Sequence, residues 1–169
     1  MILKQKEQRV AVFIDVQNMY HSAKNLYQAR VNFGEILKLA VSGRKLIRAF
    51  AYVVRTKTGE EKPFFEALTK LGMETRVRDL QEFYGGMKKA DWDVGITIDA
   101  VKSANKADVI ILVSGDGDFL QLVEYLKNQG IRVEVIAFGR SASAKLKEVA
   151  DEFIDLGETS EKYLLMSKK

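Results

Sequence analysis

The chain of 169 residues contains no cysteine, one histidine and 47% hydrophobic residues, and its formal net charge is +4. This length is typical of a single domain with a substantial core. The composition excludes disulfides, a thiol nucleophile and metal sites built from cysteine or from several histidines. No apolar run is long enough to span a bilayer, and residues 1–9 lack the apolar core of a signal peptide. We therefore expect a soluble, cytoplasmic protein with no membrane partner.

Apolar runs that suit β-strands alternate along the chain with segments of helical spacing. The first, Val10–Ile14 (VAVFI), is rich in β-branched residues and is typical of a buried parallel strand. Further strands are predicted over Leu46–Val54, Met73–Arg78, Val109–Val113, Ile131–Ala137 and Phe153–Leu156. Helices are predicted over Phe33–Val41, Pro63–Leu71, Asp93–Ala104, Phe119–Asn128 and Ala142–Ala150. This alternation predicts an α/β fold with a mainly parallel sheet.

The chain shows no long linker and no internal repeat. We expect one domain over residues 1–157, followed by a tail over residues 158–169 that forms a short helical turn or frays.

Acidic residues follow two of the predicted strands. Asp15 comes directly after the first strand, and Asp116 and Asp118 follow the fourth. In a parallel sheet the strand-to-helix loops share the carboxyl edge, where ligands bind. If these two strands are neighbours, their carboxylates converge at one place. Gly115 and Gly117 are expected to let the second loop turn sharply and approach a ligand.

Two further acids belong to the helix predicted near residue 93. Asp99 lies within the largely apolar stretch Val94–Val101, where an unpaired carboxylate is costly, so it requires a cation, a donor or solvent. Asp93 is a candidate N-cap whose carboxylate also reaches the same edge of the sheet. Asp91 is interpreted as a loop acid.

Carboxylates that lie this close repel one another and raise one another's pKa values. A divalent cation relieves this repulsion, and a ligand set made only of oxygen atoms favours Mg²⁺ or Mn²⁺. Two such ions would activate a water and stabilise the leaving oxygen in phosphodiester hydrolysis.

Each candidate also has a purely structural interpretation. Asp93 and Asp118 suit helix caps, and Asp15 suits a turn at the end of a strand. Asn18 either orients water or the scissile phosphate, or it begins a helix. Ser114 either hydrogen-bonds a carboxylate or phosphate, or it packs in the turn. The acids are more informative as a group, because one fold brings them to one edge.

Four stretches of the sequence carry a family resemblance: AVFIDVQNMY, KKADWDVGITID, ILVSGDGDFLQLVEYLKNQGIRVEVIAF and LKEVADEFIDL. Together they resemble the NYN domains of the LabA-like group, within the PIN-like nuclease superfamily, over roughly residues 10–156. The resemblance implies a Rossmann-like three-layer α/β/α sandwich in which the first strand lies beside the strand that precedes SGDGDF.

The resemblance also implies metal-dependent RNA cleavage. Its acidic positions correspond to Asp15, Asp93, Asp99, Asp116 and Asp118, with Asn18 as a polar companion. The sequence departs from the family at the approach to the third acid. There the usual Lys-Gly-x-Asp is replaced by Lys89-Ala90-Asp91-Trp92-Asp93.

Basic residues concentrate between residues 44 and 89, which hold 11 Lys and Arg against 6 Asp and Glu. Basic side chains bind the phosphates of a nucleic-acid backbone, and exposed aromatic rings stack on unpaired bases. The predicted RNA-binding residues are Arg76, Arg78, Tyr84, Lys88 and Lys89, with Arg140 before a later helix. The Gly85-Gly86 pair is expected to make this segment a substrate-gating loop. The structural alternative is a solvated charged loop around a buried aromatic anchor.

The leading hypothesis is a Mg²⁺- or Mn²⁺-dependent ribonuclease whose partner is RNA. One alternative is a non-catalytic RNA-binding or regulatory module that retains the acidic pocket. An α/β phosphotransferase or phosphatase is least favoured, because Gln17 stands where haloacid-dehalogenase-like enzymes have a second Asp and no glycine fingerprint follows the first strand. The superfamily makes a homodimer plausible, although the sequence shows no interface stripe.

Overall fold

A six-stranded parallel sheet forms the centre of the computed structural model, which describes residues 4–82, 88–89 and 91–166. The strand order is β4-β3-β1-β7-β8-β9. The bounds of these strands are Arg9–Asp15 for β1, Lys45–Arg55 for β3, Glu74–Asp79 for β4, Val109–Val113 for β7, Arg132–Ala137 for β8 and Glu152–Asp155 for β9.

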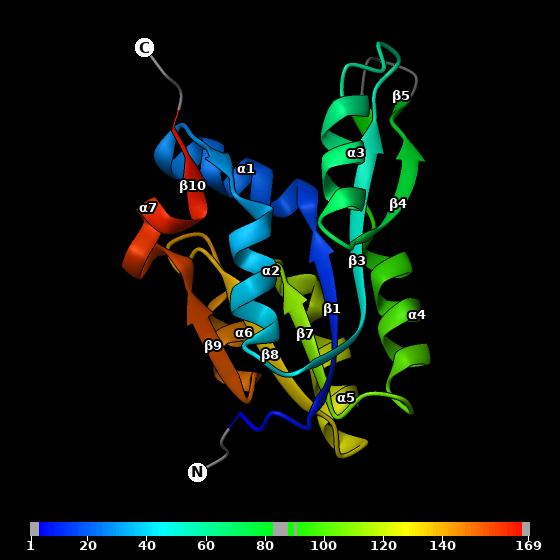
Figure 1. Ribbon diagram of the computed structural model, residues 1–169, viewed down its shortest axis with the longest axis vertical. Helices are drawn as coiled ribbons and strands as arrows, with labels where there is room; N and C mark the ends of the chain where they lie inside the picture. The colour runs from blue at the N-terminus through cyan, green and yellow to red at the C-terminus, as the bar shows by residue number, and fades with distance from the viewer. Residues whose placement is uncertain (1–3, 83–87, 90, 167–169) are drawn as a thin grey trace.

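Helices cover both faces of the sheet, which confirms the predicted three-layer α/β/α sandwich (Figure 1). One face carries α1 (Val16–Tyr27), α2 (Phe33–Val41) and α3 (Lys62–Lys70). The other carries α4 (Asp93–Ser103), α5 (Leu120–Asn128) and α6 (Ala144–Val149). No helix among the described residues is both long and apolar enough to cross a membrane.

Short elements complete the chain. The 3₁₀ helix η1 (Gly117–Phe119) precedes α5, and the C-terminal segment forms η2 (Leu156–Thr159), α7 (Ser160–Tyr163) and β10 (Leu164–Leu165). Strand β10 pairs with β2 (Arg30–Val31), and β5 (Gln81–Glu82) pairs with β6 (Lys88–Lys89), both antiparallel.

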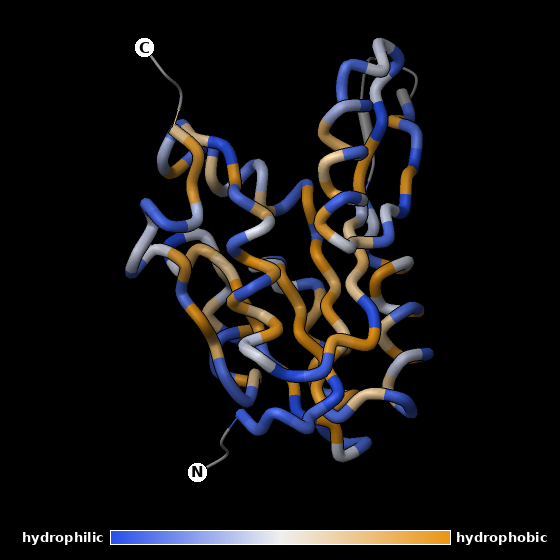
Figure 2. Tube along the Cα trace, viewed as in Figure 1, coloured by the Kyte–Doolittle hydropathy of each residue, from blue (hydrophilic) through white to orange (hydrophobic). Residues whose placement is uncertain are grey.

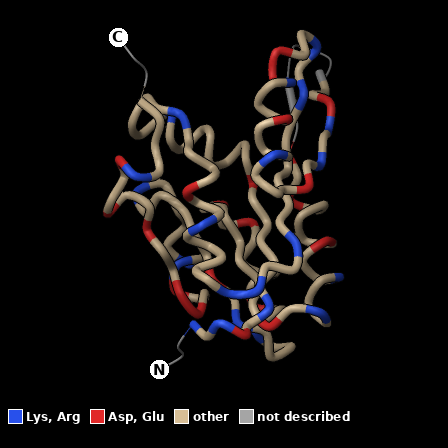
Figure 3. Tube along the Cα trace, in the orientation of Figure 1, with Lys and Arg blue, Asp and Glu red and all other residues tan. Residues whose placement is uncertain are grey.

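Strand β1 lies at the centre of the core because both of its faces are buried. Val10, Val12 and Ile14 pack on the side of α1 and α2, whereas Ala11 and Phe13 pack on the side of α4 and α5. All five are fully buried. The hydrophobic residues accordingly follow the central strands in Figure 2, and the charged residues lie mostly at the periphery in Figure 3. A continuous apolar run is therefore what this position in the sheet requires.

The observed bounds of the main strands and of all five predicted helices lie within two residues of those expected from the sequence. The segment Ala142–Ala150 forms a shorter helix, α6, because Ser143 is the N-cap and Ala150 is already extended. Helix α1 was not expected. It buries only Val16, Met19 and Ala23 along its length, so its apolar signal in the sequence is weak.

A buried ion pair joins two layers at the amino end of the sheet. Both terminal nitrogens of the Arg44 guanidinium donate to Glu134 on β8, each over 2.9 Å, and both side chains are inaccessible to solvent. Although burial opposes ionisation, the hydrogen bonds and charge of Arg44, assisted by Arg132, hold the pKa of Glu134 below its usual value. The pair is bidentate and fully desolvated, which makes either partner expensive to remove alone.

We predict that Arg44→Met lowers the free energy of unfolding by about 3–5 kcal/mol, because the buried Glu134 carboxylate loses its bidentate partner and keeps only Arg132, over 3.0 Å. Urea denaturation at pH 7 measures this change. Arg55→Met is the matched control, because Arg55 pairs with Asp79 at the surface, and its loss should cost about 1 kcal/mol or less. Equal effects of the two substitutions would contradict the assignment.

Candidate metal centre

Three carboxylates meet at the carboxyl edge of the sheet, each from a different segment. Strands β1 and β7 are adjacent and parallel, with Val10–Ile14 in register with Val109–Val113. The chain therefore delivers Asp15 and Asp116 to the same place. Asp93 joins them as the first residue of α4. One carboxylate oxygen from each residue lies within 4.8 Å of the others.

Hydrogen bonds fix the position of Asp15. Its side chain caps α1 by accepting from the Asn18 backbone N–H over 3.2 Å, and it also accepts from the Ser114 hydroxyl over 3.1 Å. The same hydroxyl accepts from the Asp116 N–H over 3.2 Å. The Asn18 side-chain oxygen accepts from the Gly115 N–H over 2.9 Å, which ties α1 to the loop after β7. Asp15, Asn18 and Ser114 therefore make the structural contacts expected of cap and turn residues. These contacts are compatible with the functional roles considered for the same residues.

Burial and mutual repulsion raise the pKa values of two of these carboxyl groups. Burial raises the pKa of Asp15 to about 6, despite the hydrogen bonds from Asn18 and Ser114, and the charges of Asp116 and Asp91 add to the shift. Burial and four neighbouring acids, with Asp116 the strongest, raise the pKa of Asp93 to about 7. A cation placed among them would remove this repulsion.

Two exposed acids stand around the group. Asp118 raises the pKa of Asp93 by its charge, and it does not cap a helix: the Asp116 side chain caps η1 by accepting from the Asp118 N–H. Asp91 accepts from the Asp93 N–H and raises the pKa values of both Asp15 and Asp93. Asp91 is therefore more than a loop acid, because its charge acts on two members of the acidic group. Trp92, rather than Asp93, holds the N-cap position of α4.

Asp99 does not join this group among the described residues, contrary to the expectation that it is a ligand. Its carboxylate accepts from the Tyr52 hydroxyl over 2.8 Å and lies 3.5 Å from the Arg76 guanidinium. Asp99 lies six positions after Asp93, which on a helix means about 600° of rotation and about 9 Å of rise. The two side chains therefore cannot point to one ion. Tyr52 and Arg76 therefore supply the donor and the cation that a carboxylate in apolar surroundings requires.

Trp92 anchors the beginning of α4. Its indole N–H donates to the Val53 carbonyl over 3.0 Å, and its ring packs against Tyr52 at 5.3 Å. The Arg78 guanidinium lies 4.3 Å from the centre of the indole ring. A Cβ on Gly95 would approach the indole to 2.6 Å, so only glycine permits this packing. Sequence reasoning missed Tyr52, although a tyrosine hydroxyl in an apolar run signals a hidden partner. Trp92 fits the structural alternative given for this segment, an aromatic anchor, and it is partly buried.

The glycines after β7 serve loop packing. A Cβ on Gly115 would lie 3.0 Å from the Ala142 backbone, and one on Gly117 would lie 2.9 Å from the Ser143 hydroxyl. The Gly115 carbonyl also accepts from the Ser143 N–H over 2.9 Å. They therefore bring two protein loops together, where the sequence had suggested close approach to a ligand.

The predicted RNA-binding residues have different surroundings. Arg76 pairs with Asp99, and the Arg78 guanidinium donates to the Asp91 carbonyl over 2.6 Å, so both arginines are partly engaged within the protein. Arg140 is exposed in the turn after β8. The backbone of Lys88 and Lys89 forms β6. Tyr84 and the Gly85-Gly86 pair lie outside the described residues.

A three-layer fold with acids at the carboxyl edge of adjacent parallel strands defines a class that includes the PIN-like nucleases. A family model described as NYN domain matches residues 9–159, and the chain belongs to this family, a PIN-like nuclease family whose domains bind RNA. Such domains usually use divalent metals.

Two individual proteins are similar over most of the chain. The low amplitude and bright protein LabA of Synechococcus elongatus is 27% identical over 165 residues, which cover 89% of this chain and 84% of LabA. The crystal structure of VPA0982 from Vibrio parahaemolyticus, a protein of unknown function, is 30% identical. It matches with a TM-score of 0.86 over 97% of this chain and 100% of that one.

The raised pKa values predict a pH-dependent stability in metal-free buffer. Asp15 and Asp93 have folded pKa values of about 6 and about 7, above their ordinary value of 3.8. Their contribution is therefore complete below about pH 4 and is lost as the pH rises through 6 and 7. Asp93→Asn should raise the Tm at pH 8 and flatten its decline between pH 4 and pH 8. Asp108→Asn is a control of opposite sign, because Arg9 lowers the pKa of Asp108. Parallel Tm profiles of wild type and Asp93→Asn would contradict the prediction.

The geometry also predicts which acids respond to metal. At a hundredfold excess over its Kd, Mn²⁺ should stabilise the wild type by about 2.7 kcal/mol and raise its Tm by roughly 5–10 °C. Asp116→Asn should abolish most of this rise. Asp99→Asn should retain it, because Asp99 lies outside the acidic group. Differential scanning fluorimetry with Mn²⁺ and with EDTA measures both, and loss of the rise only in Asp99→Asn would reverse the assignment.

Proposed function

We propose that this protein is a Mg²⁺- or Mn²⁺-dependent ribonuclease that hydrolyses phosphodiester bonds in RNA. The observation that carries the proposal is the convergence of Asp15, Asp93 and Asp116, whose oxygens lie within 4.8 Å of one another in a domain of a PIN-like nuclease family. We place this activity in the cytoplasm, as expected from the sequence.

The donor set fits a hard divalent cation, because it consists of carboxylate oxygens whose mutual repulsion a positive charge would relieve. Asp15, Asp93 and Asp116 would hold the ion. When bound, the ion would activate a water molecule and stabilise the leaving oxygen of the phosphodiester. Asp118, which is exposed and close enough to raise the pKa of Asp93, would complete the acidic rim.

Other residues would position these ligands. The Ser114 hydroxyl donates to Asp15 and accepts from the Asp116 backbone, so it couples two of the three ligands through one buried group. Asn18 holds the loop after β7 in place through Gly115. Arg140, exposed beside the acidic edge in the turn after β8, and Lys88 and Lys89 are proposed contacts for the RNA backbone.

Cleavage of a labelled RNA in Mn²⁺ or Mg²⁺ tests the proposal. Asp116→Asn should lower the cleavage rate at least about 100-fold, because even outer-shell changes at metal sites cost 10- to 100-fold. Asp108→Asn is the matched control and should cleave as the wild type does, because Asp108 lies at the opposite edge of the sheet and pairs with Arg9. EDTA should abolish cleavage.

Absence of cleavage in either metal, or undiminished cleavage by Asp116→Asn, would refute the ribonuclease. RNA binding without cleavage and without any response to metal would instead support the regulatory alternative.

A further inference from the structure

A largely apolar groove lies beside the acidic group, on the face of the sheet that α1, α2 and α3 cover. It has a volume of about 590 Å³, which is within the range of small-ligand sites. The side chains that give it its character are Val16, Tyr20, Phe33, Phe64, Leu71 and Leu165. None of the roles described above uses this groove.

The groove reaches the acidic group through the two central strands. Val16 and Gln17, which line it, directly follow Asp15. Val53 and Val54 line it from β3, one and two residues after the residue that is paired in register with Asp15. The groove therefore begins next to the strand ends that carry the acidic edge.

The rim of the groove combines exposed aromatic rings with basic groups. Tyr20 is 44% exposed and Phe64 is 38% exposed, although Phe64 also packs against Phe33. The Lys24 ammonium group lies 5.9 Å from the centre of the Tyr20 ring. Arg30 lines the groove, is exposed and has no ion-pair partner within the described part of the chain. Aromatic rings beside cations are typical of surfaces that bind single-stranded nucleic acid.

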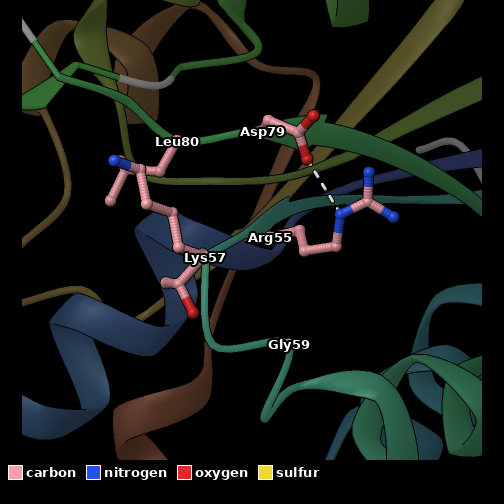
Figure 4. A pocket seen from close by; sticks show the side chains of 6 residues that line it. Arg55, Lys57, Gly59, Asp79 and Leu80 are labelled. Atoms are coloured by element: carbon pink, nitrogen blue, oxygen red, sulfur yellow. Dashed lines mark hydrogen bonds and ion pairs between the residues drawn. The ribbon is translucent and has the colours of Figure 1, made fainter.

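A second pocket, of about 430 Å³, extends this surface (Figure 4). Thr56 and Leu80 line both pockets, so the two are contiguous. Arg55 and Lys57 add basic groups to the second one, where Arg55 also pairs with Asp79 over 2.8 Å. Glu61 lines the apolar groove together with Arg30, and Asp79 lines the second pocket, so an excess of positive charge is found in the second pocket only.

We propose that the groove is a base-binding subsite, in which unpaired bases of an RNA strand stack on Tyr20 and Phe64 while Arg30 and Lys24 contact the neighbouring phosphates. This inference rests on the proposed ribonuclease and extends it, because it assigns single-stranded RNA as the substrate class. A purely apolar partner would gain nothing from these cations, and a base-paired duplex offers no free base faces to the groove.

Fluorescence anisotropy with a 5′-labelled single-stranded RNA octamer tests the subsite, in EDTA and again in Ca²⁺. Tyr20→Ala and Phe64→Ala should each weaken binding about 5- to 100-fold, the range that loss of one base–aromatic stack produces. Tyr125→Ala is the matched control, because Tyr125 is 46% exposed on α5, on the other face of the sheet. It should bind as the wild type does.

Further binding measurements distinguish contacts to the bases from contacts to the phosphates. An octamer of abasic residues should bind the wild type more weakly and should be indifferent to Tyr20→Ala. Arg30→Gln should weaken both octamers and reduce the salt dependence of binding. The octamer annealed to its complement should bind the wild type poorly and should not distinguish Tyr20→Ala from the wild type.

Several outcomes would overturn the subsite. These are unchanged binding by both aromatic variants, an equal loss with the abasic octamer, or no binding of the octamer by the wild type in either condition. A dimer in sedimentation velocity that Phe64→Ala dissociates would assign the groove to a second copy of the chain instead.

The subsite and the ribonuclease can fail separately. Binding that depends on Tyr20 and Phe64 without any cleavage in Mn²⁺ would leave the subsite standing and refute the nuclease. Metal-dependent cleavage that neither aromatic variant affects would do the reverse.

Discussion

The pairing of β1 with β7 is the constraint on which the acidic group depends. Their register brings Asp15 and Asp116 to one edge, whatever the electrostatic cost of placing them there. The apolar residues before Asp15 are fully buried on both sides of the sheet, so the strand cannot slip without exposing the core. Repulsion among the carboxylates is therefore sustained by hydrophobic packing elsewhere. A site under such strain is typical of a functional centre.

A second set of contacts holds Asp93 against the same edge. The helix that bears it is anchored by Trp92, which is fixed to the Val53 carbonyl and packed against Tyr52. Tyr52 in turn donates to Asp99 on the same helix. Two hydrogen bonds thus connect α4 to β3. One joins the Trp92 indole to the Val53 carbonyl, and the other joins the Tyr52 hydroxyl to the Asp99 carboxylate, about two helical turns further along. Asp99 therefore contributes to fixing the helix that carries Asp93 against the sheet.

Local sequence patterns predicted the centre of the sheet well because strands β1, β7 and β8 are apolar and buried on both faces. The edge rule for parallel sheets then correctly placed Asp15 near Asp116 without any coordinates. The same reasoning failed for Asp99 because it considered the apolar context of the residue and not its rotation about the helix axis. It missed Tyr52, and it missed the partner of the Trp92 indole, because Asp99 and Val53 are distant from these residues in the chain. Helix α1 was not predicted because few of its residues are buried, so its apolar pattern in the sequence is weak.

The charge distribution links the proposed metal and RNA sites. A phosphodiester is an anion, and it would approach the edge where Asp15, Asp93 and Asp116 already repel one another. Without a cation, the acidic group repels the RNA backbone, whereas the surrounding basic residues attract it. In the proposed enzyme, a bound divalent ion would offset much of this negative charge, so metal and RNA would each strengthen the binding of the other by the same factor. Stacking in the apolar groove depends mainly on surface contact and little on charge. The proposed subsite would therefore hold the bases of an RNA strand both with and without the ion.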